Sequence, residues 1–197
     1  MPDPIPSTLR RDILFKRDNL ALDFINSASE RIVEVLGLIT AFKQARLPFI
    51  YVSFRTEVIT HRLIRERLAK SLPVAVPFTD IKNRRIIPVL IKDWEHDLTS
   101  GSYGILEPCP SRVEEYSIPP GLLDVIIVPG SVFDRHCGRY GYGGGYYDRF
   151  LERNAPLALR IGLAFQLQLL ESVPLAPYDQ RMDLIVTETE IIECERR

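Results

Sequence analysis

The sequence has 197 residues, of which 46% are hydrophobic and 26% are charged, and its formal net charge is −1. These ordinary values favour one globular domain over residues 1–197, large enough to bury a core without disulfide or metal staples. The near-neutral charge provides no global attraction to nucleic acid or to a membrane surface, so we expect neither as a partner.

Cysteine usage and the first residues indicate the compartment. Cys109, Cys137 and Cys194 are widely spaced and odd in number, and they predict reduced thiols, not a disulfide framework or a zinc cluster. The opening stretch MPDPIPSTLRRD is polar and interrupted by proline, unlike a secretion signal, and no apolar run reaches the roughly 18 residues of a membrane span. We therefore expect a cytoplasmic protein.

In chain order, the first half alternates helical and strand patterns. Apolar residues at helical spacing predict helices over residues 9–20, after a cap at Ser7 or Thr8, and over 30–47 and 56–70. Runs rich in β-branched and aromatic residues predict strands over 49–54, 73–78 and 85–91. The polar, proline-containing stretch 96–121 is typical of a long surface loop.

The second half continues the alternation. An apolar strand over 122–130 precedes a loop over 131–145 and a helix over 146–154, and strands are expected over 158–165, 182–189 and 190–194. Because the strands are apolar on both faces, the pattern predicts a mostly parallel sheet covered by helices on both sides. In such folds, ligands bind beyond the carboxyl ends of the strands.

The loop before the helix at 146–154 is rich in glycine. The stretch RYGYGGGYYDRFL, residues 139–151, holds four of the eleven glycines, and three of them are consecutive. Glycine runs weaken helices and strands, so this run indicates that something approaches the backbone closely. Unpaired amides and the helix dipole at this point suit a phosphate chain, and Arg139 adds a full positive charge.

The spacing of the glycines matches neither common phosphate-binding motif. Gly138 and Gly143 have the spacing of a P-loop, but Gly144 stands where a lysine is required. Tyr146 stands where a dinucleotide fingerprint needs its last glycine. A tight turn with close backbone packing is therefore an alternative interpretation.

Two aspartates are candidate metal ligands. Asp148 lies in the first turn of the predicted helix, and Asp183 lies at the start of a predicted strand. Beside bound phosphates, a carboxylate repels them unless a cation bridges the two, and Mg²⁺ is bound in this way. Without a ligand, Asp148 would complement the helix dipole and Asp183 would be a turn residue.

Taken together, these stretches resemble the 5-formyltetrahydrofolate cyclo-ligase family, also called 5,10-methenyltetrahydrofolate synthetase. The resemblance covers nearly the whole chain and is carried by LRRDILFKR, YVSFRTEVIT, GSYGILEP, DVIIVPGSVFDRHCGRYGYGGGYYDRFL, IGLAF and RMDLIVTE, in the family's order. It implies one three-layer α/β/α domain with a mostly parallel central sheet (NagB/RpiA/CoA-transferase-like), acting as a monomer on a reduced folate and ATP.

The resemblance also implies a reaction. MgATP phosphorylates the formyl oxygen of 5-formyltetrahydrofolate, and N10 captures the resulting iminium phosphate to give 5,10-methenyltetrahydrofolate, ADP and phosphate. Phosphorylation converts a poor leaving group into a good one, so catalysis rests mainly on positioning and charge stabilisation.

The resemblance assigns roles to particular residues. Arg10 and Arg139 would contact ATP, Asp148 and Asp183 would hold Mg²⁺, and Arg139 with Tyr147 would be catalytic. The loop would wrap the triphosphate and touch the folate through Gly141, Tyr142, Gly143, Gly144, Gly145, Tyr146 and Tyr147. The folate would also meet Val52, Glu57 on its pterin ring, and Tyr103 as an aromatic wall.

Three positions depart from the family's pattern: Pro6 replaces a frequent lysine, Tyr142 a frequent arginine and Tyr178 a frequent histidine. Arg11 could bind ATP in place of the lysine that Pro6 replaces. Because tyrosine makes no bidentate charge contact, phosphate binding would depend more on Arg139 and the backbone. Two alternatives stay open: a relative with the same MgATP site acting on another amide-like substrate, and a non-enzymatic nucleotide-binding protein.

Overall fold

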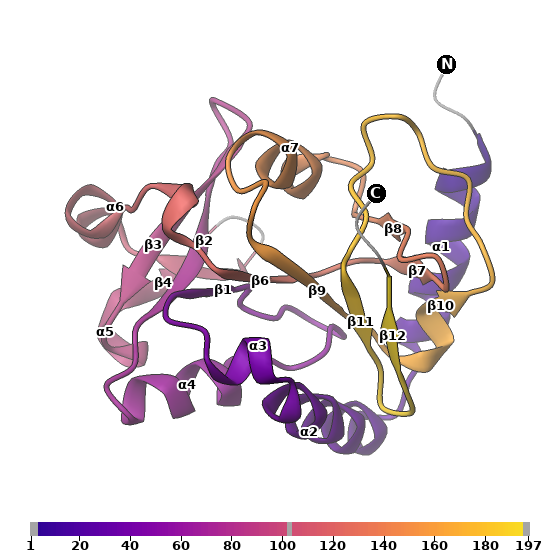
Figure 1. The fold of residues 1–197 in the computed structure, drawn as a ribbon, viewed down its shortest axis with the longest axis horizontal. Coiled ribbons are helices and arrows are strands. Elements are labelled where there is room, and N and C mark those ends of the chain that lie inside the picture. Colours follow the sequence, from indigo (N-terminus) through magenta and orange to yellow (C-terminus); the bar gives the residue numbers. More distant parts are fainter. Residues whose placement is uncertain (1–3, 102–103, 195–197) are drawn as a thin grey trace.

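A seven-stranded sheet forms the centre of the computed structural model, which describes residues 4–101 and 104–194 (Figure 1). The strand order is β12-β11-β9-β6-β1-β2-β3. The inner strands pair in parallel, and only the edge strands β3 and β12 pair antiparallel to their neighbours. This confirms the predicted α/β class. The strands are β1 (Pro48–Ile50), β2 (Val74–Asp80), β3 (Arg85–Ile91), β6 (Val125–Val128), β9 (Leu159–Leu163), β11 (Leu184–Val186) and β12 (Ile191–Glu193).

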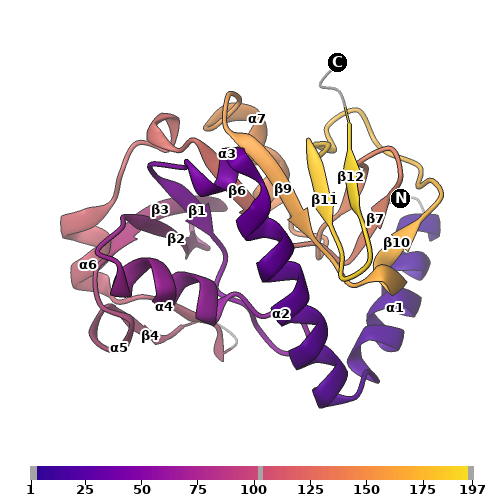
Figure 2. The ribbon, with the colours of Figure 1, turned by 60° about the horizontal axis from the view of Figure 1, so that its bottom comes forward.

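Helices cover both faces of this sheet. On one face lie α2 (Leu22–Leu38), α3 (Thr40–Lys43) and α4 (His61–Ala69), and on the other lies α7 (Tyr146–Arg153) (Figures 1 and 2). The first helix, α1 (Pro4–Asp18), stands apart from these layers, beside β7 and β10 (Figure 2).

The strands supply one core to each face because successive side chains point in opposite directions. Within β1, Phe49 packs in the core beneath α7, whereas Ile50 packs in the core beneath α2 and α4. In β6, Ile126 and Ile127 divide in the same way, and both are fully buried. The near-continuous apolar runs in the sequence therefore reflect strands buried on both sides.

Two regions predicted to be loops contain regular structure. The stretch 96–121 forms most of a small unit, so the prediction of one long surface loop is wrong: its elements are α5 (Trp94–Asp97), β4 (Leu98–Ser100), β5 (Leu106–Pro108), α6 (Pro110–Tyr116) and a 3₁₀ turn (Pro120–Leu122). Asp97 anchors this unit, because its buried carboxylate accepts the amides of Lys92 and Asp93 and pairs with Arg112. The loop 131–145 contains β7 (Val132–Asp134) and β8 (Arg139–Tyr140), which join β10 (Leu169–Leu170), after a 3₁₀ turn (Gln166–Gln168), in a second sheet.

Several predicted boundaries also shift. The first helix begins at Pro4, so Ser7 and Thr8 lie within it and do not cap it. The helix predicted over 30–47 starts earlier, at Leu22, and is interrupted at Ile39, whose backbone is extended. The strand predicted over 49–54 stops at Ile50, because the following segment turns and bonds to Thr60 through the carbonyl of Tyr51 and the amide of Ser53.

The cysteine prediction is wrong for two of the three thiols. Cys137 and Cys194 form a disulfide, with their Cα atoms 6.2 Å apart, and Cys109 is free. Cys137 lies in a tight turn held by Asp134, which accepts the Gly138 amide, and its backbone is left-handed (φ 58°). The turn lies beside Cys194, the residue after β12, which follows Cys137 by 57 positions. Sequence spacing alone does not show that these two residues are close.

No helix in the described part of the chain is both long and apolar enough to span a membrane.

The disulfide predicts a thiol count and a loss of stability. Unreduced, denatured protein should show one thiol by mass spectrometry after alkylation, and reduced protein should show three. Cys194→Ser should lower the free energy of unfolding by about 2–4 kcal/mol, since it removes the cross-link from the unfolded chain. Cys109→Ser is the matched control and should change little in urea unfolding. Three alkylated thiols without reductant would contradict the bridge.

Candidate functional site

Two loops meet at the carboxyl edge of the sheet because β1 and β6 are neighbouring parallel strands. The segment after β1, residues 51–60, carries Val52 and Glu57. The segment after β6 leads through Pro129 into the glycine loop, by which we mean residues 141–145. The strand order runs from β1 to β2 on one side and to β6 on the other, which is the switch point where ligands bind in open α/β sheets.

The glycine loop uses the conformational freedom of its glycines. Gly143 (φ 97°) and Gly145 (φ 63°) are left-handed, and Gly145 is the residue before α7. A Cβ on Gly144 would lie 2.8 Å from the ring of Tyr146, and one on Gly143 would lie 3.5 Å from Nη1 of Arg10. Close packing against the protein therefore accounts for part of the run, and it brings Arg10 of α1 beside the loop.

Arg139 is a buried residue of β8, close to the start of the glycine loop. Only 2% of this residue is exposed, Nη1 donates to the carbonyl of Pro129 (3.1 Å), and Nη2 donates to Oδ1 of Asp148 (2.7 Å). Its guanidinium carbon lies 5.9 Å from the centre of the Tyr147 ring. Burial is the main cause that raises the pKa of Tyr147, followed by the charge of Glu57.

Two buried polar atoms here lack partners among the described residues: Nε of Arg139 and the hydroxyl of Tyr147. An unpaired buried donor costs about 1–3 kcal/mol, so such groups call for an explanation. Because both belong to residues predicted to be catalytic, a bound ligand that accepts from them is the simplest one.

The two predicted metal ligands have different surroundings. Asp148 accepts from Arg139 and from the amide of Gln180 (3.2 Å), both on Oδ1. Asp183 is 7% exposed, and its Oδ2 accepts the amide of Arg160 (2.7 Å). No group of three or more His, Cys, Asp or Glu side chains that could hold a metal occurs within residues 4–101 and 104–194. The structure therefore pairs Asp148 with the guanidinium group of Arg139, and it gives Asp183 a hydrogen bond from a backbone amide.

Glu57 and Tyr142 come together although 85 positions separate them. The Tyr142 hydroxyl donates to Oε1 of Glu57 (2.5 Å), and the amide of Phe54 donates to Oε2 (2.9 Å). Burial raises the pKa of Glu57 above its usual value. The hydrogen bond from Tyr142 is the strongest of the influences that oppose this rise. Val52 is 4% exposed and packs in the core under α2, so it forms the floor of this region.

Arg17 completes the cluster, and the sequence reasoning missed it. It is 5% exposed, and it donates to the Tyr142 hydroxyl (2.9 Å) and to Oγ1 of Thr56 (3.2 Å). A signal was present, because Arg17 follows Arg10 by seven residues, or two helical turns, and so lies on the same face of α1.

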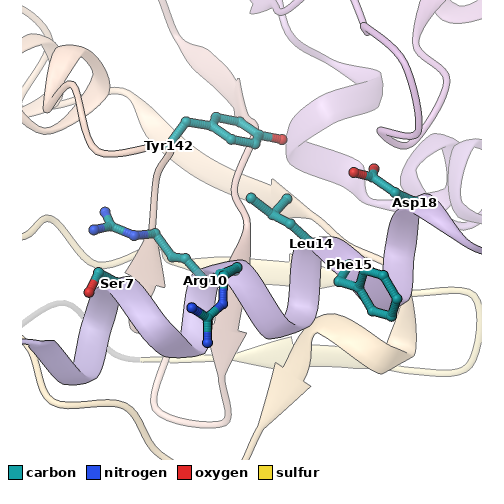
Figure 3. Close-up of a pocket in the computed structure, with 7 residues that line it drawn as sticks. Ser7, Arg10, Leu14, Phe15, Asp18 and Tyr142 are labelled. Atoms are coloured by element: carbon teal, nitrogen blue, oxygen red, sulfur yellow. The ribbon is translucent and has the colours of Figure 1, made fainter.

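An open cavity of about 470 Å³ lies between α1 and the glycine loop. Figure 3 shows Tyr142 reaching from the loop over Leu14, with its hydroxyl directed toward the end of α1 that carries Asp18. Arg10 lines the same cavity, which therefore lies beside two residues predicted to bind ligands, Arg10 and Tyr142.

The remaining predicted residues are placed as follows. The ring of Tyr146 lies 5.3 Å from the guanidinium carbon of Arg149, on the far side of the loop. Arg11, the predicted substitute at the Pro6 departure, is exposed and bonds to Asp12. Tyr178 is 68% exposed. Tyr103 lies outside the described residues.

The fold is a three-layer α/β arrangement, and its polar candidate site lies at the switch point of the sheet. The profile of the 5-formyltetrahydrofolate cyclo-ligase family matches residues 5–188. The chain belongs to this family, as its motifs indicated.

Individual relatives agree with the family match. The chain is similar to the mitochondrial 5-formyltetrahydrofolate cyclo-ligase of Arabidopsis thaliana (32% identity, 79% of this chain and 64% of that protein) and to the Saccharomyces cerevisiae enzyme (30% identity, 90% and 92%). It resembles the structure of Aquifex aeolicus 5,10-methenyltetrahydrofolate synthetase with a TM-score of 0.85 at 30% identity, covering 98% of this chain and 94% of that one. The Mycoplasma pneumoniae synthetase is similar in fold (TM-score 0.72, 21% identity, covering 93% and 98%).

The Arg139–Asp148 pair predicts a non-additive effect on stability. The arginine side chain is 1% exposed and the aspartate 14%. Asp148→Asn should lower the free energy of unfolding by about 2–4 kcal/mol, because it leaves the more deeply buried charge without its carboxylate. Adding Arg139→Met should recover part of this loss, since both charges are then absent. Urea unfolding measures all three variants, and strictly additive losses would contradict a coupled pair.

Proposed function

We propose that this protein converts 5-formyltetrahydrofolate to 5,10-methenyltetrahydrofolate with MgATP and releases ADP and phosphate. The observation that carries the proposal is the meeting of Glu57 with the glycine loop, beside the unpartnered Nε of Arg139 and hydroxyl of Tyr147. A carboxylate suited to a pterin and a loop suited to phosphates are thus adjacent, in a chain whose family match spans residues 5–188.

The residues present fit a nucleoside triphosphate. A Cβ on Gly143 would contact Arg10, and one on Gly141 would meet Arg139, so two cations lie close to the glycines of the loop. The unpartnered Nε of Arg139 and hydroxyl of Tyr147 can each donate to a phosphate oxygen. Bound ATP would supply the phosphoryl group that turns the formyl oxygen into a leaving group. These donors would hold the phosphates in line and stabilise the charge that develops.

The residues also fit Mg²⁺, which prefers oxygen ligands and phosphate. Both hydrogen bonds that Asp148 accepts from described residues end on Oδ1, so Oδ2 remains open to a cation. We propose Asp148 as one ligand and Asp183 as the other, and the bond from the Arg160 amide fixes the orientation of Asp183. The ion would neutralise the repulsion between Asp148 and the phosphates.

Glu57 is suited to the pterin ring. A carboxylate with two oxygens matches the adjacent donors at the edge of a pterin. Because each oxygen has two lone pairs, Glu57 can accept from the folate while it keeps the contacts of Phe54 and Tyr142. Val52 would pack beneath the ring, and we propose Tyr103 as its aromatic wall.

The activity test uses purified protein with 5-formyltetrahydrofolate and MgATP. We expect folate-dependent release of ADP, together with the rise in near-ultraviolet absorbance of the methenyl product. Thermal shifts separate the alternatives, since a true ligand stabilises the folded state by mass action. Stabilisation by MgATP without any effect of folates would favour another amide-like substrate, and the absence of folate-dependent ADP release would refute the proposal.

The metal proposal predicts a loss of magnesium dependence. Calorimetric binding of ADP to the wild-type protein should strengthen when Mg²⁺ is added. Asp148→Asn and Asp183→Asn should each reduce that gain by about tenfold or more, the effect expected when a metal ligand is lost. The exposed carboxylate variant Glu171→Gln is the control and should keep the full gain. Circular dichroism confirms folding at the temperature used, and an undiminished gain in Asp148→Asn would limit that residue to its pairing with Arg139.

A further inference from the structure

The geometry points to Arg17 as a positioning residue: it holds the Tyr142 hydroxyl against Glu57 and keeps that carboxylate ionised for the folate. This inference rests on the proposed function, because it assigns a role in folate binding to a residue outside the motifs that define the site. It concerns the Arg17 cluster, by which we mean Arg17, Thr56, Asp18, Tyr142 and Glu57.

Arg17 is a buried cation without a direct carboxylate partner. It is 5% exposed, yet none of the ion pairs formed among the described residues includes it. A buried charge is tolerated only when it is paired or hydrogen-bonded, so its partners must compensate it in another way. Both of its hydrogen-bond acceptors are hydroxyl oxygens, on Thr56 and Tyr142.

Each of these two hydroxyls in turn donates a hydrogen bond to a carboxylate. Thr56 accepts from Arg17 and donates to Asp18, and Tyr142 accepts from Arg17 and donates to Glu57. Because a hydroxyl has one proton, accepting from a cation directs that proton to the other partner. Arg17 therefore fixes the direction of both bonds, and it is connected to the two carboxylates through these hydroxyls.

The cluster joins the three segments that the proposed function uses. Arg17 lies on α1, Thr56 and Glu57 lie in the segment after β1, and Tyr142 lies in the glycine loop. Arg17 also lies 5.7 Å from the centre of the Tyr142 ring, so it contacts both the ring and the hydroxyl. Although 49% of Tyr142 is exposed, these two contacts with Arg17 hold its hydroxyl at Glu57.

Burial raises the pKa of Glu57, and the groups that oppose this rise are the hydrogen bonds from Tyr142 and Phe54 and, after them, the charge of Arg17. Arg17 faces Glu57 from α1, Tyr51 from the end of β1, and Tyr142 and Tyr147 from the glycine loop and the start of α7. Asp18 of α1 accepts from Thr56, the residue before Glu57. Burial raises the pKa of each of these three tyrosines, so they are neutral.

Arg17 is therefore the cation that opposes the rise in the pKa of Glu57 caused by burial. Without it, Glu57 should take up a proton at higher pH, and a protonated carboxyl binds the pterin donors poorly. The effect should appear as weaker folate binding on the acidic side.

The experiment compares Arg17→Gln with the wild type. The acid limb of kcat/KM for the folate should move upward by about one pH unit, at the lower end of what a lost neighbouring charge does. The KM for the folate should rise about tenfold near the wild-type midpoint, whereas the affinity for MgADP should change less than twofold. An unmoved acid limb would overturn the proposal.

Three further variants exclude a merely structural effect. Arg67→Gln is the matched control, since Arg67 is a buried arginine that donates to the backbone carbonyls of Ala45 and Pro73, and it should lose stability without moving the acid limb. Arg17→Lys keeps the charge and should restore the acid limb. Tyr142→Phe should raise the KM, and adding it to Arg17→Gln should cost little more, because the two residues act in series.

A direct titration keeps this inference separate from the proposed function. Carbon-13 spectra of glutamate-labelled protein follow Glu57, assigned with Glu57→Gln, without substrate or turnover. The Glu57 carboxyl should titrate about one unit higher in Arg17→Gln than in the wild type. If the protein lacks cyclo-ligase activity but this shift occurs, the proposed function fails and the role of Arg17 stands. An unshifted titration would overturn that role whatever the activity.

Discussion

The parallel pairing of β1 with β6 is the constraint on which the site depends. Their registered ladder, with Ile50 opposite Ile127, ends both strands at one edge of the sheet, so the segments that follow must leave side by side. Both strands are buried on both faces, which fixes the register, because a slip of one residue would exchange the two cores. Glu57 can therefore reach Tyr142 across 85 positions of sequence without any local signal of the contact.

The glycine loop is held from several directions before any ligand binds. Arg139 bonds to Asp148 at the start of α7, Arg149 donates to the carbonyl of Gly144, and Arg10 contacts Gly143. The left-handed glycines Gly143 and Gly145 leave room beside the backbone for the guanidinium groups of Arg10 and Arg149. A loop fixed in this way loses less conformational entropy on binding, so under the proposed function its donors would be in place when charge develops on the phosphates.

Structural features that depend only on neighbouring residues could be predicted from the sequence. It predicted a strand over 122–130, of which Val125–Val128 forms β6, and also the glycine loop and the helix from Tyr146. Apolar runs, glycines and helix periodicity are properties of neighbouring residues. The Cys137–Cys194 bridge and the burial of Arg17 depend instead on which distant segments meet. The stretch 96–121 misled for a similar reason: its turn residues are real, but the buried carboxylate of Asp97 organises them into a folded unit.

The two buried arginines of the site show how differently a protein can compensate the same charge. Arg139 meets Asp148 directly, which binds the cation firmly but uses one oxygen of a carboxylate proposed to hold the metal. Arg17 acts through hydroxyls, which leaves both oxygens of Glu57 able to accept further donors. A direct pair at Glu57 would satisfy the carboxylate with one strong partner and would weaken the interaction that we propose with a neutral pterin edge. With Tyr142 placed between the two charges, its hydrogen bond opposes the rise in the pKa of Glu57 that burial causes, and the carboxylate keeps hydrogen-bonding capacity for the proposed substrate.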